Sequence, residues 1–189
     1  MTEKKTDRRT LKTRKAICNA LAQLLAEKEL HKVTVQEIAD LAEVNRVTFY
    51  KHYLDVYDLY DKLENEVLTD LGLLILRLQE LNEDEFFAEL IGYIYENSTV
   101  FKMIFSPNST CQMRDKFSRI MEGLLRQMQK EEGTSLSDEY IDYFSRYRVQ
   151  GSLSVISKWV LSDFKEPKED IIKIVSWLDG NTTKLIVQE

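Results

Sequence analysis

A short stretch around residue 50 holds side chains whose chemistry suits the grooves and backbone of a DNA duplex. Arg46 can donate two hydrogen bonds to O6 and N7 of guanine, and Val47 can contact the methyl group of thymine. Thr48, Tyr50 and Lys51 can hold phosphates. Each residue also has an ordinary alternative, because Arg46 and Lys51 can be solvated charges and Tyr50 can be a core aromatic. The DNA interpretation therefore depends on the elements that position these residues.

The segment before and around this stretch carries the signals of two short helices joined by a turn. Thr34 and Glu37 form a capping box that opens the first of these helices. A turn at Glu43-Val44 follows, and Asn45 is a suitable N-cap for a helix that runs to about His52. This order predicts a helix-turn-helix, whose second helix enters the major groove of DNA. Free amides at both helix N-termini can also bind phosphates.

The charge distribution agrees with a DNA-binding N-terminal part. Residues 1–53 hold eleven Lys and Arg against seven Asp and Glu, whereas the rest of the chain holds fifteen against twenty-five. A basic head on an acidic body indicates that only the head meets a polyanion. A solvated tail is the alternative, and the helix-turn-helix pattern favours DNA.

Composition predicts an all-α protein of ordinary globular type. Gly (6) and Pro (2) are scarce among 189 residues, and 43% of residues are apolar. Apolar periodicity predicts about nine helices. They cover 7–27, a segment from Thr34, 45–52, 55–81, 84–96, 99–105, 111–131, 138–162 and 167–179, the last ending at Gly180 as C-cap.

Several classes of protein are disfavoured by what the chain contains. No apolar run approaches a membrane span, and the charged N-terminus does not resemble a signal peptide. Cys18 and Cys111 lie outside any metal-binding spacing, so we expect buried, reduced thiols in a cytoplasmic protein without metal or cofactor. Because no phosphate loop, nucleophile motif or metal-ligand spacing is found, we expect no enzyme.

The chain resembles the tetracycline-repressor (TetR) family of bacterial transcriptional regulators. The resemblance rests on the apolar positions of the first helix and on "TVQEIADLAEVNRVTFYKHYLDVYDLY", and it covers residues 8–63. Weaker similarity to a Firmicutes-type C-terminal subgroup lies in "YENSTVFKMIF", in Gly151 and in "KWVLSDFKEP". The resemblance implies a helix-turn-helix domain over 1–53 and a helical effector-binding and dimerisation domain over 54–189.

The resemblance also implies roles for single residues in the head. The implied base contacts come from Gln36, Arg46 and Val47, and the implied phosphate contacts from Thr34, Thr48, Tyr50, His52 and Thr13 with its basic neighbours. His52 can instead be a capping or core histidine, and we expect Tyr53 to be a core aromatic. Asn45 stands where Ser is usual, and both cap well. Val56 replaces a Lys that often grips phosphate, which removes one expected contact.

For the C-terminal part, the family implies a homodimer formed by the last two long helices and a small-molecule effector. The candidates for the dimer interface are Gly151, Ser152, Val155, Trp159, Ile171, Ile174, Val175 and Leu178. The candidates for the ligand pocket are Tyr93, Phe101, Phe105, Phe117, Met121 and Tyr147. Both sets can instead belong to the core of one protomer. The family habit is repression at a palindromic operator, and the alternative function is a co-regulator that acts through a protein partner with weak or no DNA binding.

Overall fold

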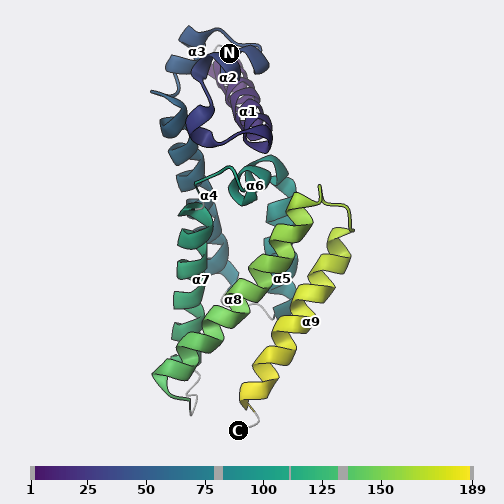
Figure 1. Ribbon diagram of the computed structural model, residues 1–189. Coiled ribbons are helices and arrows are strands. Elements are labelled where there is room, and N and C mark those ends of the chain that lie inside the picture. Colours follow the sequence, from purple (N-terminus) through teal and green to yellow (C-terminus); the bar gives the residue numbers. More distant parts are fainter. Residues whose placement is uncertain (1–2, 79–82, 111, 132–135, 188–189) are drawn as a thin grey trace. The chain divides into compact units, whose positions relative to one another are not determined.

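The computed structural model describes residues 3–78, 83–110, 112–131 and 136–187, and every regular element within these ranges is helical (Figure 1). This confirms the predicted all-α class. No helix in these ranges is long and apolar enough to cross a membrane. The elements in chain order are α1 (Glu3–Glu27), the 3-10 helix η1 (Leu30–Lys32), α2 (Val35–Leu41), α3 (Arg46–Tyr50), α4 (Val56–Leu78), α5 (Glu83–Glu96), α6 (Ser98–Phe105), α7 (Gln112–Glu131), α8 (Asp138–Leu161) and α9 (Lys168–Val187).

The helices pack into two compact units. Unit 1 comprises Met1–Asp70 and Asn97–Cys111, and unit 2 comprises Leu71–Glu96 and Gln112–Glu189. Helix α4 runs through the boundary, so it belongs in part to each unit. The division into functional domains at residue 53 stays a prediction, because packing units and functional domains are defined differently.

Unit 1 is held together by the apolar stripe of α1. Ile17, Leu21 and Leu25 recur every four residues and are completely buried, as the 3.6-residue helical period requires for an inward face. They meet Ile38 of α2 and Phe49 of α3, which are also completely buried. The whole core cluster consists of Ile17, Ala20, Leu21, Leu25, Leu30, Val33, Ile38, Phe49, Tyr53, Val56, Leu59, Tyr60, Leu63 and Met103.

Helix α6 and the segment after it belong to unit 1, although they follow α5 of unit 2 in the chain. The carbonyl oxygen of Leu25, near the end of α1, accepts hydrogen bonds from Ser106 Oγ at 2.8 Å and from Asn108 Nδ2 at 3.0 Å. The amide of Leu30 donates to the Asn108 carbonyl at 3.1 Å. Carbonyl groups in the last turn of a helix have no amide donor within the helix. The bonds from Ser106 and Asn108 therefore satisfy a carbonyl of α1 that has no partner within that helix.

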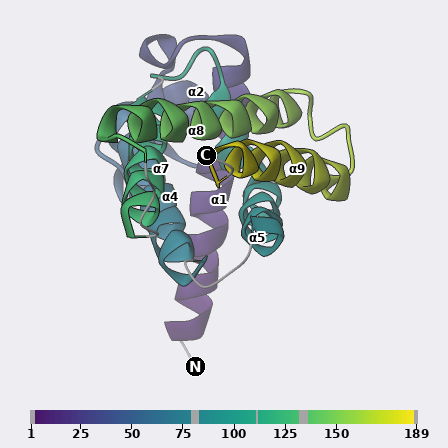
Figure 2. The ribbon, with the colours of Figure 1, turned by 90° about the horizontal axis from the view of Figure 1, so that it is seen from below.

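Unit 2 is built from antiparallel helices. Helix α5 lies beside α9, α7 packs on α8, and α8 packs on α9 (Figure 2). Between α8 and α9, Arg148 Nε donates to Asp179 Oδ1 at 2.9 Å, and Nη2 of the same guanidinium pairs with Oδ2. Both side chains are more than nine-tenths buried, so this is a buried, bidentate ion pair.

Most predicted helix ends agree with the structure to within a few residues, but the end of the last helix was wrong. Helix α9 passes Gly180 and continues to Val187. Glycine costs about 1 kcal/mol inside a helix without ending it. The hydroxyl of Thr182 bonds back to the Leu178 carbonyl at 2.7 Å within the continuing helix. The expected end of the fourth helix at Leu81 lies outside the described residues.

Of the two cysteines, the structure describes Cys18. Cys18 is a free, partly buried thiol of α1, and burial raises its pKa to about 11. Cys111 lies outside the described residues. A raised pKa keeps Cys18 in the poorly nucleophilic thiol form.

Candidate nucleic-acid interface

The start of α2 is fixed by the predicted capping box. Thr34 Oγ1 accepts from the Glu37 amide at 3.3 Å, and the Thr34 amide donates to Glu37 Oε2 at 3.0 Å. Lys28 forms an ion pair with the same carboxylate, and the ammonium, followed by the Thr34 bonds, lowers the pKa of Glu37 to about 2. The Thr34 hydroxyl also donates to Glu37 Oε2 at 2.8 Å, so a phosphate contact from this hydroxyl would have to replace that bond.

The turn between α2 and α3 places a second cap. Glu43 takes a left-handed conformation with φ of 54°, and the Val44 amide donates to the Ala39 carbonyl at 2.9 Å. Asn45 Oδ1 then accepts from the Val47 amide at 2.8 Å, which confirms Asn45 as the N-cap of α3. Phe49 is completely buried and anchors the inner face of α3. These contacts form the predicted helix-turn-helix.

The outer face of α3 carries the predicted reading residues. Val47 is 64% exposed and Tyr50 is 49% exposed, and Arg46 and Lys51 are exposed as well. Arg46 Nη2 donates to the Tyr50 hydroxyl at 3.4 Å, and its guanidinium carbon lies 6.0 Å from the centre of that ring. Tyr50 thus supports Arg46 one helical turn away, in a position from which the guanidinium can enter a groove.

The remaining predicted DNA contacts lie on α1, α2 and around α3. Gln36 is exposed on α2, and its Nε2 donates to Asp40 Oδ1 at 2.6 Å. Thr48 is half-buried on α3, and His52 is half-buried just beyond the end of α3. Thr13 is half-buried on α1. Tyr53 is 2% exposed, which confirms it as a core aromatic.

The start of α4 explains the unusual Val56. Its side chain is 6% exposed and packs in the core cluster of unit 1. The Asp58 amide donates to Asp55 Oδ1 at 2.8 Å, and the Leu54 amide donates to Asp58 Oδ2 at 2.8 Å. The Leu54 amide and then Lys62 lower the pKa of Asp58. This helix end is therefore capped by the protein's own carboxylates, which occupy donors that a phosphate would need.

Sequence reasoning missed Lys62 of α4. Its ammonium donates to Asp58 Oδ2 at 2.9 Å and to the carbonyl of His52 at 3.2 Å. The spacing of Asp58 and Lys62, four residues apart on a predicted helix, was a readable signal for the first bond. The bond to His52 depends on tertiary packing and has no local signal.

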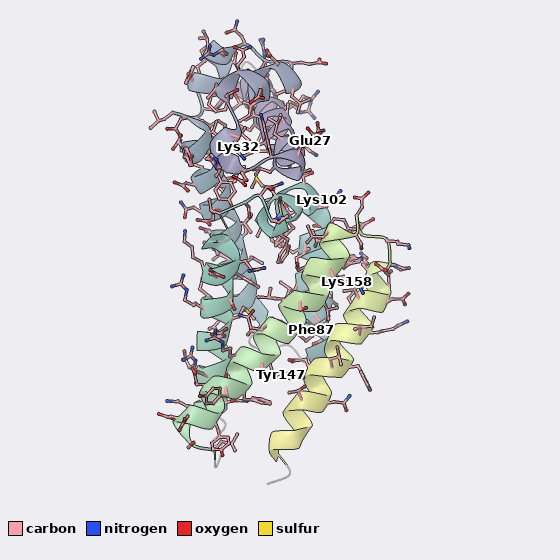
Figure 3. All side chains as sticks on the ribbon, viewed as in Figure 1. Glu27, Lys32, Phe87, Lys102, Tyr147 and Lys158 are labelled. Atoms are coloured by element: carbon pink, nitrogen blue, oxygen red, sulfur yellow. The ribbon has the colours of Figure 1, made fainter. Side chains whose placement is uncertain are left out.

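The predicted pocket residues fall in both units. Phe101 and Phe105 are buried on α6 in unit 1, with ring centres 6.3 Å apart. Tyr93, Phe117 and Met121 are half-buried in unit 2. Tyr147 of α8, labelled in Figure 3, is 68% exposed. A pocket lined by these residues stays a prediction.

The predicted dimer residues divide by exposure. Trp159, Ile171 and Val175 are buried within unit 2, where they serve the core of the protomer itself. Ile174 and Leu178 of α9 are exposed, as is Gly151 of α8, while Ser152 and Val155 are half-buried. Sequence reasoning missed three further aromatic side chains that are more than two-thirds exposed, namely Tyr140, Tyr143 and Trp177.

Comparison with known proteins decides the family. Residues 17–61 match the family model described as bacterial regulatory proteins of the tetR family, and residues 82–178 match a model described as a transcriptional regulator C-terminal region. The chain belongs to the TetR family. TetR-family proteins are DNA-binding transcriptional regulators, and the helix-turn-helix described above lies within the residues that match the tetR family model.

Relatives and solved structures agree with the TetR assignment. The uncharacterised HTH-type transcriptional regulator YxbF of Bacillus subtilis (strain 168) is 38% identical over 58 residues, which are 30% of this chain and 15% of YxbF. A TetR transcriptional regulator from Streptococcus agalactiae 2603V has a similar fold, with a TM-score of 0.60 and 23% identity over 92% of this chain and 97% of its own. The regulator FadR from Bacillus subtilis, solved with stearoyl-CoA, gives a TM-score of 0.61 and 15% identity over 86% of this chain and 95% of the FadR chain.

Proposed function

We propose that this TetR-family protein is a repressor that binds a palindromic operator as a homodimer and leaves it when a small molecule binds. The observation that carries the proposal is the exposed outer face of α3, where Arg46, Val47 and Tyr50 project from a helix capped by Asn45 and anchored by Phe49. Arg46 and Val47, with Gln36 of α2, would contact bases, and the other predicted residues would contact phosphates. We propose no enzymatic activity.

The dimer would form through the exposed faces of α8 and α9. Tyr140, Tyr143 and Tyr147 lie at helical spacings of three and four residues, so they share one face of α8, and each is at least 67% exposed. On α9, Trp177 is 69% exposed, and Ile174 and Leu178 are 44% and 45% exposed beside it. Large aromatic side chains grouped on a surface mark interfaces, because burying them is strongly favourable. We therefore assign Tyr147 to the dimer interface instead of the pocket.

The oligomeric state tests this assignment. Replacing Tyr143 and Trp177 together by Ser should convert a dimer to a monomer in sedimentation measurements, whereas Leu54→Ser, which removes another exposed apolar side chain from unit 1, should leave the mass unchanged. A wild-type protein that is monomeric at micromolar concentration would contradict the proposal.

A small-molecule effector is proposed for residues 54–189. The support is the structure of FadR from Bacillus subtilis, a regulator of the same fold that was solved in complex with stearoyl-CoA. For this chain, Tyr93, Phe101, Phe105, Phe117 and Met121 stay the candidate lining residues. Release of the purified protein from its operator by fractions of a cell extract would identify the ligand.

DNA binding is tested by selecting duplexes from a random pool and measuring affinity across salt concentrations. Phosphate contacts require log affinity to fall linearly with log salt. Arg46→Ala should relax the preference at one base position, whereas Thr48→Ala, which removes a proposed phosphate contact and keeps the bond between Arg46 and Tyr50, should weaken selected and random duplexes alike. Equal loss of preference from both variants would contradict these roles.

The second candidate is a co-regulator that acts through a protein partner. The observation in its favour is the capped, acidic start of α4, where buried Val56 replaces a phosphate-binding Lys. A purified dimer with no salt-dependent affinity for any selected duplex would favour this function over the first.

A further inference from the structure

Tyr53 is the point where α1, α3 and α4 meet in unit 1. Its ring is buried beside Phe49 of α3, with ring centres 5.5 Å apart. From α1, Arg14 Nε donates to the Tyr53 hydroxyl at 3.4 Å. From α4, the ammonium of Lys62 lies 5.5 Å from the centre of the Tyr53 ring, within the range of a cation–π contact. Two cations from two helices therefore hold one tyrosine.

Each of these cations is paired with a carboxylate of α4. Arg14 forms an ion pair with Glu66, and Lys62 forms one with Asp58 at 2.9 Å. We call the five residues Arg14, Tyr53, Asp58, Lys62 and Glu66 the Tyr53 clamp. The clamp joins α1 to α4 on one side of Tyr53 and joins the end of α3 to α4 on the other.

Lys62 also fixes the chain directly after the recognition helix. Its ammonium donates to the carbonyl of His52 at 3.2 Å, two residues beyond the end of α3. Carbonyls at a helix C-terminus lack helical donors and carry partial negative charge, so a cation there is favourable. A helix of five residues has little stability of its own, and its orientation depends on such tertiary contacts.

We propose that Lys62, together with Arg14, is a positioning residue for operator recognition, which sets the orientation of α3 against α4 without contacting a base. This inference rests on the proposed function, since it requires an operator. Loss of Lys62 removes none of the DNA-facing side chains of α3. It removes the contact with the His52 carbonyl that fixes the C-terminal end of α3 against α4. Sequence-specific binding therefore falls, while binding to the phosphate backbone, which tolerates small changes of orientation, is retained.

The test compares Lys62→Met with Lys62→Arg and with Lys32→Met. Arginine keeps the cation, and Lys32 of η1 (Figure 3) is an exposed lysine of the same unit that pairs with Glu29 and not with the clamp. Affinity is measured for the selected operator and for a random duplex of equal length across salt concentrations, together with the thermal midpoint of each variant.

The expected result is specific to Lys62→Met. Its operator affinity should fall about tenfold. This is the change expected when a misoriented α3 loses one hydrogen bond to a base of the operator. Random-duplex affinity and the slope against salt should stay at wild-type values, and the thermal midpoint should fall by no more than about 4 °C, the shift that the loss of a largely exposed ion pair produces. Lys62→Arg should recover most of the operator affinity, and Lys32→Met should match the wild type.

Three results would overturn the inference. An equal loss on both duplexes with a salt slope smaller by about 0.9 would make Lys62 a phosphate contact. A lower thermal midpoint that Lys62→Arg fails to restore would make it a folding residue only, and an unchanged operator affinity would remove any role. Failure of the proposed function is recognised separately, because the wild type itself would then show no preference for any duplex.

A second pair of variants tests the other side of the clamp. Arg14→Met and Tyr53→Phe both remove the bond between Arg14 and the Tyr53 hydroxyl, and Tyr53→Phe keeps the ring that Lys62 contacts. The double variant should therefore lose no more operator affinity than Arg14→Met alone. Additive losses would show that Arg14 acts independently of Tyr53.

Discussion

Asp179→Asn is expected to destabilise unit 2 strongly, because it removes one partner of a buried ion pair. The Asp179 and Arg148 side chains are 8% and 9% exposed and make two parallel contacts between α8 and α9. The Arg148 guanidinium carbon also lies 5.7 Å from the centre of the Phe144 ring. Asparagine keeps the shape of the side chain but removes the carboxylate charge from both contacts with the buried guanidinium. Such a change typically costs about 3–5 kcal/mol.

The assay is thermal unfolding followed by far-UV circular dichroism at one protein concentration, since a dimer melts at a concentration-dependent temperature. For a chain of this length, about 3–5 kcal/mol corresponds to a midpoint lower by about 6–20 °C. Lys173→Met is the matched control on α9, because its ion pair with Asp170 is exposed and should contribute less than about 1 kcal/mol. Replacing Arg148 and Asp179 together by Met and Leu should recover most of the loss.

An Asp179→Asn variant that melts at the same temperature as the Lys173→Met control would refute this expectation. That result would mean that water reaches the Arg148 guanidinium and replaces the lost carboxylate. A double variant that is less stable than Asp179→Asn would show instead that the attraction between Arg148 and Asp179 stabilises unit 2 more than well-packed apolar side chains would.

Two further predictions concern the helix-turn-helix. The pKa of Glu37 is about 2 in the folded protein, below its ordinary value of 4.5. The ionised carboxylate therefore contributes fully to the stability of the fold above pH 4.5, and this contribution is lost as the pH falls toward 2. Glu37→Gln should therefore lower the unfolding midpoint at neutral pH, and the gap to wild type should close on acidification; a gap that stays constant down to pH 2 would contradict this assignment. Glu43→Gly should raise the free energy of unfolding by about 1 kcal/mol. Glycine relieves a left-handed backbone conformation that costs about 1–2 kcal/mol, and this gain exceeds the cost of the greater conformational entropy of glycine in the unfolded chain. Glu43→Ala, which keeps the strain, should show no such gain in a urea titration.

The helices and the two caps of the head could be read from the sequence because their signals are local. Thr34 with Glu37 and Asn45 with Val47 are separated by two or three residues, so their hydrogen bonds follow from helix geometry. Gly180 gave a misleading signal for the same reason. A local stop signal is weak against the packing of a long helix, and α9 continued past it.

The division of apolar stripes between core and surface could not be read from the sequence. Trp159 and Trp177 both lie on periodic stripes of long helices, yet the first is 1% and the second 69% exposed. An apolar stripe predicts that a helix face is buried. It does not show whether that face is buried by the same chain or by a second copy of the chain. The role of Lys62 was hidden for a related reason, since the carbonyl of His52 reaches it only through the fold.

The membership of α6 in unit 1 limits how this head can be exchanged between relatives. A recombinant that joins residues 1–70 to a foreign body would lack Met103 from the core cluster and both donors to the Leu25 carbonyl. A working chimera must therefore carry residues 97–111 along with the head, although they lie within the match to the C-terminal family model. For this chain, the segment to be exchanged in a chimera is therefore encoded by two separate stretches of the gene and not by one.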